Sequence, residues 1–271
     1  MTGPKVVAII QGRMSASRLP GKILRDLGGQ PMLGRVIERV RRASALALVL
    51  VATTIDPSDD PVEAYCRSRN CPVFRGEMYD VLDRFYRAAL QSKADVIVRV
   101  TADCPVIDPV IIDLVVGELR RSGADFAANR LPPPWKRTFP IGLDVEACTF
   151  AALERAWKEA DQMFQREHVM PYFYEGIPVD AFDMTKTSQA VSPRGFRVLL
   201  VNHIPDFGSK RWTVDTPEDL ALMQQVYARF GGRDDFSWMD VLSLLEREPN
   251  LAALNAGVEH KSAFDVDDRQ R

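Results

Sequence analysis

The sequence has few cysteines and histidines, and its opposite charges nearly cancel. Its 271 residues include four cysteines and three histidines, and no two cysteines form a C-x-x-C pair. We therefore expect reduced thiols in a cytoplasmic protein, without a cysteine-based metal site. The 35 Lys and Arg residues against 37 Asp and Glu residues give a net charge of -2. That balance lacks the basic excess of a general nucleic-acid-binding protein.

Long apolar runs are also missing. No stretch approaches the roughly 18 residues that a membrane-spanning helix needs, so we expect no membrane partner. The short apolar run at residues 6–10 continues into a Gly-Arg turn without a small-residue cleavage site, which favours a buried strand over a signal peptide. The hydrophobic fraction of 46% and the length suit a globular α/β protein that needs no disulfides.

Strand-like runs alternate with helical periodicity along the chain. We expect strands at residues 6–10, 47–53, 72–74, 96–100, 145–150, 196–201 and 212–215. Helices are expected at residues 33–43, 61–70, 81–90, 109–121, 150–161, 217–230 and 238–246. This order predicts a mostly parallel sheet with helices on both faces. We expect one domain over residues 1–255, with an inserted subregion around residues 130–195, and a flexible charged tail over residues 256–271.

Polar clusters follow several of these strands, where ligands of open parallel sheets usually bind. The first cluster, residues 11–22, contains Arg13, Arg18 and Lys22 together with Gly12 and Gly21. Flexible glycines and cations suit a polyphosphate, although scattered charge on a solvated turn is an equal alternative. The loop is not a P-loop, because Ile follows Lys22 where that motif requires Ser or Thr.

Two acids follow other strands. Asp103 comes shortly after residues 96–100, and Asp215 precedes Thr216, a candidate helix N-cap. Each acid could cap a helix or loop, or the two together could hold Mg²⁺, which prefers one or two carboxylates plus substrate phosphates. Spacing alone does not show that they meet.

Two further polar groups are candidate substrate ligands. Asp144 and Glu146 alternate as on a strand, so they would share a face and bind sugar hydroxyls or contact solvent. Arg166, Glu167 and His168 form a polar triplet that we place at the start of a helix. A lone histidine is more often structural than catalytic.

Six segments of the chain, in this order, resemble one family. They are IIQGRMSASRLPGKIL, FRGEMYDVLDRFYRAA, VRVTADCPVIDP, GLDVE, REHVMPYF and RWTVDTPEDL, and they span roughly residues 5–230. These segments resemble the CMP-sugar cytidylyltransferases, especially the spore-coat polysaccharide (SpsF-like) branch, which is related to the acylneuraminate and Kdo cytidylyltransferases.

The resemblance implies a GT-A-like, Rossmann-like nucleotidyltransferase fold, with a mixed sheet sandwiched by helices. It implies CTP as donor, an acidic sugar as acceptor, Mg²⁺ as cofactor and a homodimer. Arg13 and Lys22 would hold the triphosphate, and Asp103 and Asp215 would bind Mg²⁺. The nucleotide would also contact Gln11, Gly12, Arg18, Asp80, Arg84 and Thr101. The acceptor would contact Asp144, Glu146, Arg166, Glu167 and His168.

The chain departs from that branch at two positions. Gly12 stands where Ala is common, and we expect a small effect because either residue leaves room for phosphate; Ala102 stands where Gly is common. The main alternative function is a GT-A glycosyltransferase, but Asp103-Cys104-Pro105 lacks the D-x-D pair that such enzymes usually carry. A catalytically silent scaffold of polysaccharide assembly is the second alternative.

Overall fold

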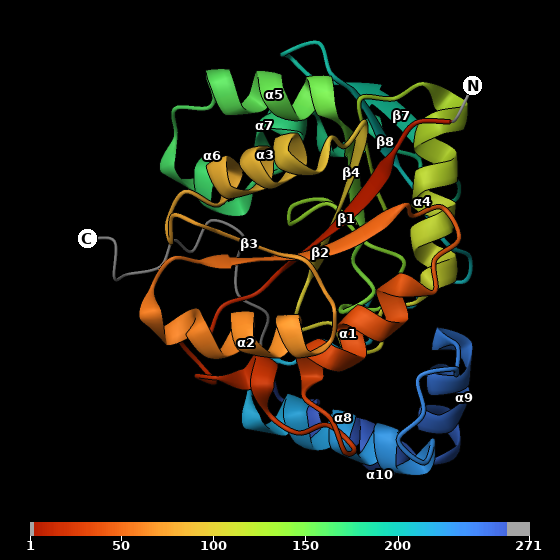
Figure 1. Ribbon diagram of the computed structural model, residues 1–271. Coiled ribbons are helices and arrows are strands. Elements are labelled where there is room, and N and C mark those ends of the chain that lie inside the picture. Colours follow the sequence, from red (N-terminus) through yellow and green to blue (C-terminus); the bar gives the residue numbers. More distant parts are fainter. Residues whose placement is uncertain (1–2, 259–271) are drawn as a thin grey trace.

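A mixed sheet with helices on both faces forms the centre of the molecule (Figure 1). The computed structural model describes residues 3–258. The eight strands have the order β3-β2-β1-β4-β6-β5-β8-β7. Their bounds are β1 Val6–Gln11, β2 Leu48–Thr54, β3 Val73–Gly76, β4 Val96–Thr101, β5 Phe126–Ala128, β6 Glu146–Thr149, β7 Ser188–Val191 and β8 Arg197–Leu200.

Strands β1 to β4 are mutually parallel, and β5 is parallel to β8. Strand β6 runs antiparallel to β4 and β5, and β7 runs antiparallel to β8. The predicted α/β class and mostly parallel mixed sheet are therefore confirmed. Because β1, β2 and β4 point the same way, their carboxyl ends lie at one edge of the sheet.

Two helical layers cover the sheet. The helices are α1 Met32–Arg41, α2 Asp60–Ser68, α3 Val81–Ser92, α4 Pro109–Ser122, α5 Phe150–Glu159, α6 Met163–His168, α7 Pro171–Tyr174, α8 Pro217–Arg229, α9 Trp238–Arg247 and α10 Pro249–Ala252. Alternate residues of β1 enter opposite cores, as strand geometry requires. Ala8 and Ile10 belong to one hydrophobic core, with residues of α1, α4, α8 and α9, whereas Val7 and Ile9 belong to a second core, with residues of α3, α5 and α7.

Local sequence explains where several helices begin. Thr216 accepts a hydrogen bond from Asp219 N, and the Asp219 side chain in turn accepts one from Thr216 N, which forms a capping box at the start of α8. Pro217 takes the first helical position, where its missing N–H costs nothing. The predicted N-cap at Thr216 is confirmed.

The structure corrects three local predictions. Residues 212–215 form no strand; the adjacent Arg211 makes a single bridge to Ile141 instead. Glu146 begins β6 but Asp144 precedes it, so strand alternation does not place these two acids on one face. The triplet at residues 166–168 ends α6 rather than starting a helix. Short β5 and β7 were not predicted, because three or four residues carry too little periodicity.

Within residues 3–258, no helix combines the length and apolar character needed to cross a membrane. Of the predicted tail over residues 256–271, only the first three residues are described, and Val258 N donates to Asn255 O at 3.0 Å. The rest of that prediction lies outside the described residues.

Candidate active site

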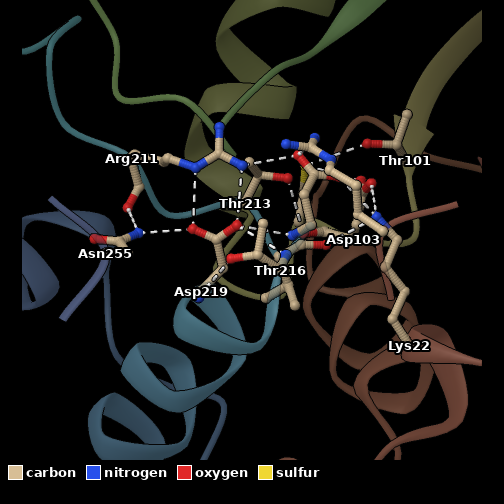
Figure 2. A network of polar contacts seen from close by, with 12 residues as sticks. Lys22, Thr101, Asp103, Arg211, Thr213, Thr216, Asp219 and Asn255 are labelled. Carbon is tan, nitrogen blue, oxygen red and sulfur yellow. Dashed lines mark hydrogen bonds and ion pairs between the residues drawn. The ribbon is translucent and has the colours of Figure 1, made fainter. Parts of the chain in front are cut away.

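Lys22 joins three segments that are remote in sequence. It ends the 11–22 loop after β1, and its Nζ donates to Asp103 Oδ2 at 2.7 Å (Figure 2). It also donates to Asp215 Oδ1 at 2.9 Å. The same ammonium donates to Val214 O at 2.8 Å. The structure thus brings Lys22, Asp103 and Asp215 together at the carboxyl edge of the sheet.

Backbone contacts hold the two acids side by side. Val214 N donates to Asp103 O at 2.8 Å, and Thr213 Oγ1 donates to the same oxygen at 3.2 Å. Residues 212–213 also lie against Gly142, whose φ of +103° is a conformation that favours glycine. A Cβ at Gly142 would stand 2.5 Å from Thr213 N, so a larger residue there would displace the segment that carries Asp215.

Three cations surround Asp215. Besides Lys22, Arg18 Nη2 lies 2.9 Å and Arg211 Nη2 lies 2.8 Å from its Oδ2. Burial by itself favours the neutral acid, but these cations outweigh it and lower the pKa of Asp215 to about 2. Burial opposes the charge of Lys22 as well, yet Asp103 and Asp215 raise the pKa of its ammonium. Lys22 and Asp215 are therefore both charged at neutral pH.

A second layer fixes Arg211. Its guanidinium donates to both oxygens of the fully buried Asp219, at 3.0 and 2.9 Å. Asn255 donates to Asp219 Oδ1 at 2.8 Å and to Arg211 O at 3.1 Å, as Figure 2 shows. Sequence reasoning missed the part that Asp219, Arg211 and Asn255 play at the site, because their partners become adjacent only in the folded chain.

The donor set of Asp103 and Asp215 fits Mg²⁺. The described residues contain no group of three or more His, Cys, Asp or Glu side chains suited to a metal ion. A pair of carboxylates is nonetheless what Mg²⁺ uses when substrate phosphates supply its remaining ligands. Asp103 and Asp215 are both partly exposed, with side-chain exposures of 22% and 19%.

Arg84 of α3 forms a second cationic region, beside Arg13. Its side chain is buried, and its Nη1 donates to Glu77 O at 2.7 Å. Within residues 3–258 its Nε has no hydrogen-bond partner. Burial, and then the charge of Arg13, lower the pKa of Arg84 to about 10. Two neighbouring cations with an unused buried donor suit an anionic ligand.

Two predicted ligands, Asp80 and Arg166, pair with each other. Asp80 caps α3 by accepting from Asp83 N at 2.9 Å, and Arg166 donates to Asp80 Oδ2 through Nε and Nη2 at 2.9 and 2.7 Å. Arg166 also donates to the carbonyls of Trp157 and Ala160. These contacts join α3, α5 and α6, so they give both residues a structural role.

The two acids of the GLDVE segment bind arginines that the sequence analysis missed. Asp144 lies 3.3 Å from Arg130 Nε and 2.9 Å from Arg137 Nη1. Glu146 is buried and pairs with Arg99 of β4, which also donates to Gln11 Oε1 at 3.0 Å. The neighbouring Thr101 hydroxyl lies 3.2 Å from Cys104 Sγ. Arg99 was predictable only after β4 and β6 were paired, because that register sets it opposite Glu146.

Gly12 and Ala102 lie so close together that a side chain at one position limits the side chain at the other. A Cβ at residue 12 would stand 2.7 Å from Ala102 Cβ and 3.2 Å from Ile23 Cδ1. Ala102 N donates to Gln11 O at 2.8 Å, and this hydrogen bond sets the distance between the segments that contain Gly12 and Ala102. Gly12 therefore makes room for the methyl group of Ala102, and an alanine at position 12 would clash with it in this chain. Whether the residue at position 12 affects phosphate binding stays a prediction.

We expect Gly12→Ala to lower the free energy of unfolding by about 1–3 kcal/mol, the usual cost of overpacking. Ala102→Gly in the same chain removes the clashing methyl group and should recover most of that loss. Urea unfolding of both single variants and the double variant gives the coupling energy. Strictly additive effects would contradict the contact.

The mostly parallel sheet, the cationic loop after β1 and the paired acids at the edge of the sheet define a nucleotidyltransferase-like α/β protein. A family model described as cytidylyltransferase matches residues 7–196. The chain therefore belongs to the cytidylyltransferase family, as the sequence resemblance predicted.

Individual relatives agree with that assignment. The chain is 30% identical to the spore coat polysaccharide biosynthesis protein SpsF of Bacillus subtilis, over 91% of this chain and 96% of that protein. It is 33% identical to an uncharacterized Methanocaldococcus jannaschii protein, over 97% of this chain and 100% of the other. A solved cytidylyltransferase of Leptospira borgpetersenii has a TM-score of 0.82 at 31% identity and covers 95% of this chain and 100% of its own.

Proposed function

We propose that the protein transfers CMP from CTP to an acidic sugar, with release of pyrophosphate, for surface polysaccharide biosynthesis. The observation that carries the proposal is the meeting of Lys22, Asp103 and Asp215 in a chain of the cytidylyltransferase family. Relatives support the acceptor class: one is named for spore coat polysaccharide biosynthesis and several are named 3-deoxy-manno-octulosonate cytidylyltransferases.

The reaction is an in-line displacement at the α-phosphorus. An oxygen of the acceptor forms the new P–O bond while the bond to the β-phosphate oxygen breaks, so pyrophosphate leaves and the hydroxyl proton passes to solvent. The protein forms no covalent bond; it positions the reactants and neutralises charge. Lys22, Arg13 and Arg18 would bind the triphosphate. The buried Arg84, whose Nε has no hydrogen-bond partner within residues 3–258, supports an anion beside Arg13.

Asp103 and Asp215 would hold Mg²⁺, which supplies charge neutralisation and orientation to the phosphates. Lys22 already lies between these acids, so its ammonium would lie next to a metal ion that they hold. Lys22, Arg18 and Arg211 also keep the carboxylate of Asp215 ionised.

The arginines near the GLDVE segment favour an acid as acceptor. This cluster contains three arginines and two acids, so its net charge is +1; the residues are Arg99, Arg130, Arg137, Asp144 and Glu146. A carboxylate of the sugar would balance it. Asp144 and Glu146 then orient the arginines rather than binding hydroxyl groups themselves, while contacts of Glu167 and His168 with the acceptor stay a prediction. We also retain a cytoplasmic homodimer as an expectation.

A pyrophosphate-release assay with four nucleoside triphosphates and a panel of acidic sugars tests the proposal. We expect release only when CTP, Mg²⁺ and one acidic sugar are all present, and none with the corresponding neutral sugars. Turnover of a sugar nucleotide without pyrophosphate release would indicate a glycosyltransferase. CTP binding without turnover of any acceptor would favour a scaffold.

A further inference from the structure

Asp59 is a buried acid whose position in the fold calls for an explanation. It is 1% exposed and ends the short helix η2 Pro57–Asp59, directly before α2. This is the N-cap position of α2, where an Asp side chain normally accepts a hydrogen bond from the first helical turn. The Asp59 side chain makes no such bond. Its carboxylate therefore does not cap α2, and its hydrogen-bond partners lie in other segments.

Those partners lie on β2 and in the loop after β1. Asp59 Oδ2 accepts hydrogen bonds from Thr53 Oγ1 at 2.8 Å, from Thr54 N at 3.0 Å and from Thr54 Oγ1. Asp59 Oδ1 accepts one from Met14 N at 2.7 Å. The bonds to β2 fix the carboxylate on the rigid sheet, and the bond to Met14 is its link to the loop.

The backbone of Met14 also makes hydrogen bonds within the 11–22 loop. Its carbonyl accepts hydrogen bonds from Ala16 N at 2.9 Å and from Gly21 N at 2.8 Å. The second bond brings the end of the loop back to its beginning, one residue before Lys22. A continuous path of short hydrogen bonds thus runs from Asp59 through Met14 to Gly21. Gly21 directly precedes Lys22, whose ammonium binds Asp103 and Asp215.

We propose that Asp59 is a positioning residue that anchors the 11–22 loop through Met14 N and so sets Lys22 for the nucleotide. Only the kinetic consequence of this proposal rests on the proposed function. An anchored loop lowers the ordering cost of binding a triphosphate, so losing the anchor raises KM for CTP more than it lowers kcat.

Asp59→Ala and Thr53→Val form a matched pair of variants. Both remove buried hydrogen bonds of the same carboxylate, but Thr53→Val is nearly isosteric and leaves the bond to Met14 intact. Asp59→Asn keeps the shape and one acceptor for Met14 N, but the neutral amide is a weaker acceptor. Its effect should fall between those of the wild type and Asp59→Ala.

Hydrogen–deuterium exchange of the full, ligand-free chain measures the anchor without any assay of function. In Asp59→Ala we expect amides of residues 12–22 to exchange about 10- to 100-fold faster, the range for losing a hydrogen bond to a charged group. Thr53→Val should leave these rates unchanged. If Asp59→Ala fails to fold, a rise of at least about 3-fold in Asp59→Asn against none in Thr53→Val supports the proposal.

Pyrophosphate release then measures the consequence for the reaction. We expect KM for CTP to rise at least about 10-fold in Asp59→Ala, with a smaller fall in kcat, and a partial return in Asp59→Asn. Unchanged loop exchange in Asp59→Ala, or equal acceleration in Thr53→Val, would overturn the anchor. An inactive wild type with the expected exchange pattern would reject the proposed function and leave the anchor supported.

Discussion

Asp103→Ala is expected to lower turnover at least ~10²-fold, the scale of losing one essential electrostatic contact. The side chain of Asp103 binds Lys22 at 2.7 Å and would share Mg²⁺ with Asp215. Its backbone carbonyl, not its side chain, holds residues 213–214, so the variant keeps the contact that positions Asp215. Loss of activity with an unchanged fold would therefore report on the carboxylate alone.

Asp95→Ala is the matched control. Asp95 lies just before the first residue of β4, at the opposite end of that strand from Asp103, and its carboxylate accepts a hydrogen bond from Lys5 N at 2.7 Å. Initial rates of pyrophosphate release across a Mg²⁺ titration distinguish weaker metal binding from lost turnover. Near-normal turnover of Asp103→Ala at saturating Mg²⁺ would reject its role as a metal ligand. Asp103→Asn should lose activity as well, since a neutral amide cannot replace the charge.

Lys22→Met is expected to raise the dissociation constant for CTP at least ~10-fold, the effect of one lost charge-assisted hydrogen bond. Methionine retains the apolar stem of a side chain that is only 10% exposed. The change also leaves Asp103 and Asp215 facing one another without their shared cation. We expect this to lower the free energy of unfolding by about 2 kcal/mol.

The response of the Lys22→Met variant to Mg²⁺ is a second test. Because Mg²⁺ can replace the missing positive charge between the acids, Mg²⁺ alone should raise the Tm of Lys22→Met by more than that of the wild type. Lys5→Met, at the other end of β1, is the control lysine; Lys5 Nζ donates to a backbone carbonyl, Ser92 O. An unchanged CTP affinity in Lys22→Met would remove this residue from the phosphate site.

The alternation of apolar runs and helical periods allowed most of the fold to be predicted. Strands β1, β2 and β4 occur within a residue or two of their expected positions, because buried parallel strands are continuous apolar runs. The segment at residues 212–215 differs, because Trp212 and Val214 are buried like strand residues but lack a ladder partner. Burial pattern alone does not distinguish an extended segment from a strand.

Prediction of the candidate site was uneven for a related reason. Asp103 and Asp215 could be found because each lies at or shortly after the end of an apolar run, and Lys22 because it lies in the cationic loop that follows one. Both positions have a topological meaning in parallel sheets. Arg99, Arg211 and Asp59 have no such signal, because what matters is the partner that the fold supplies. Asp59 in particular has the sequence context of an ordinary helix cap.

The sequence by itself determined the α/β class, the cationic loop and the family resemblance, since these depend on local periodicity and on residues close together in the chain. Only the tertiary structure decided that Lys22 lies between Asp103 and Asp215, that Arg166 pairs with Asp80, and that Gly12 accommodates Ala102. Contacts of this kind follow from strand register and chain crossings, which bring distant residues within a few ångströms and leave no trace in local composition.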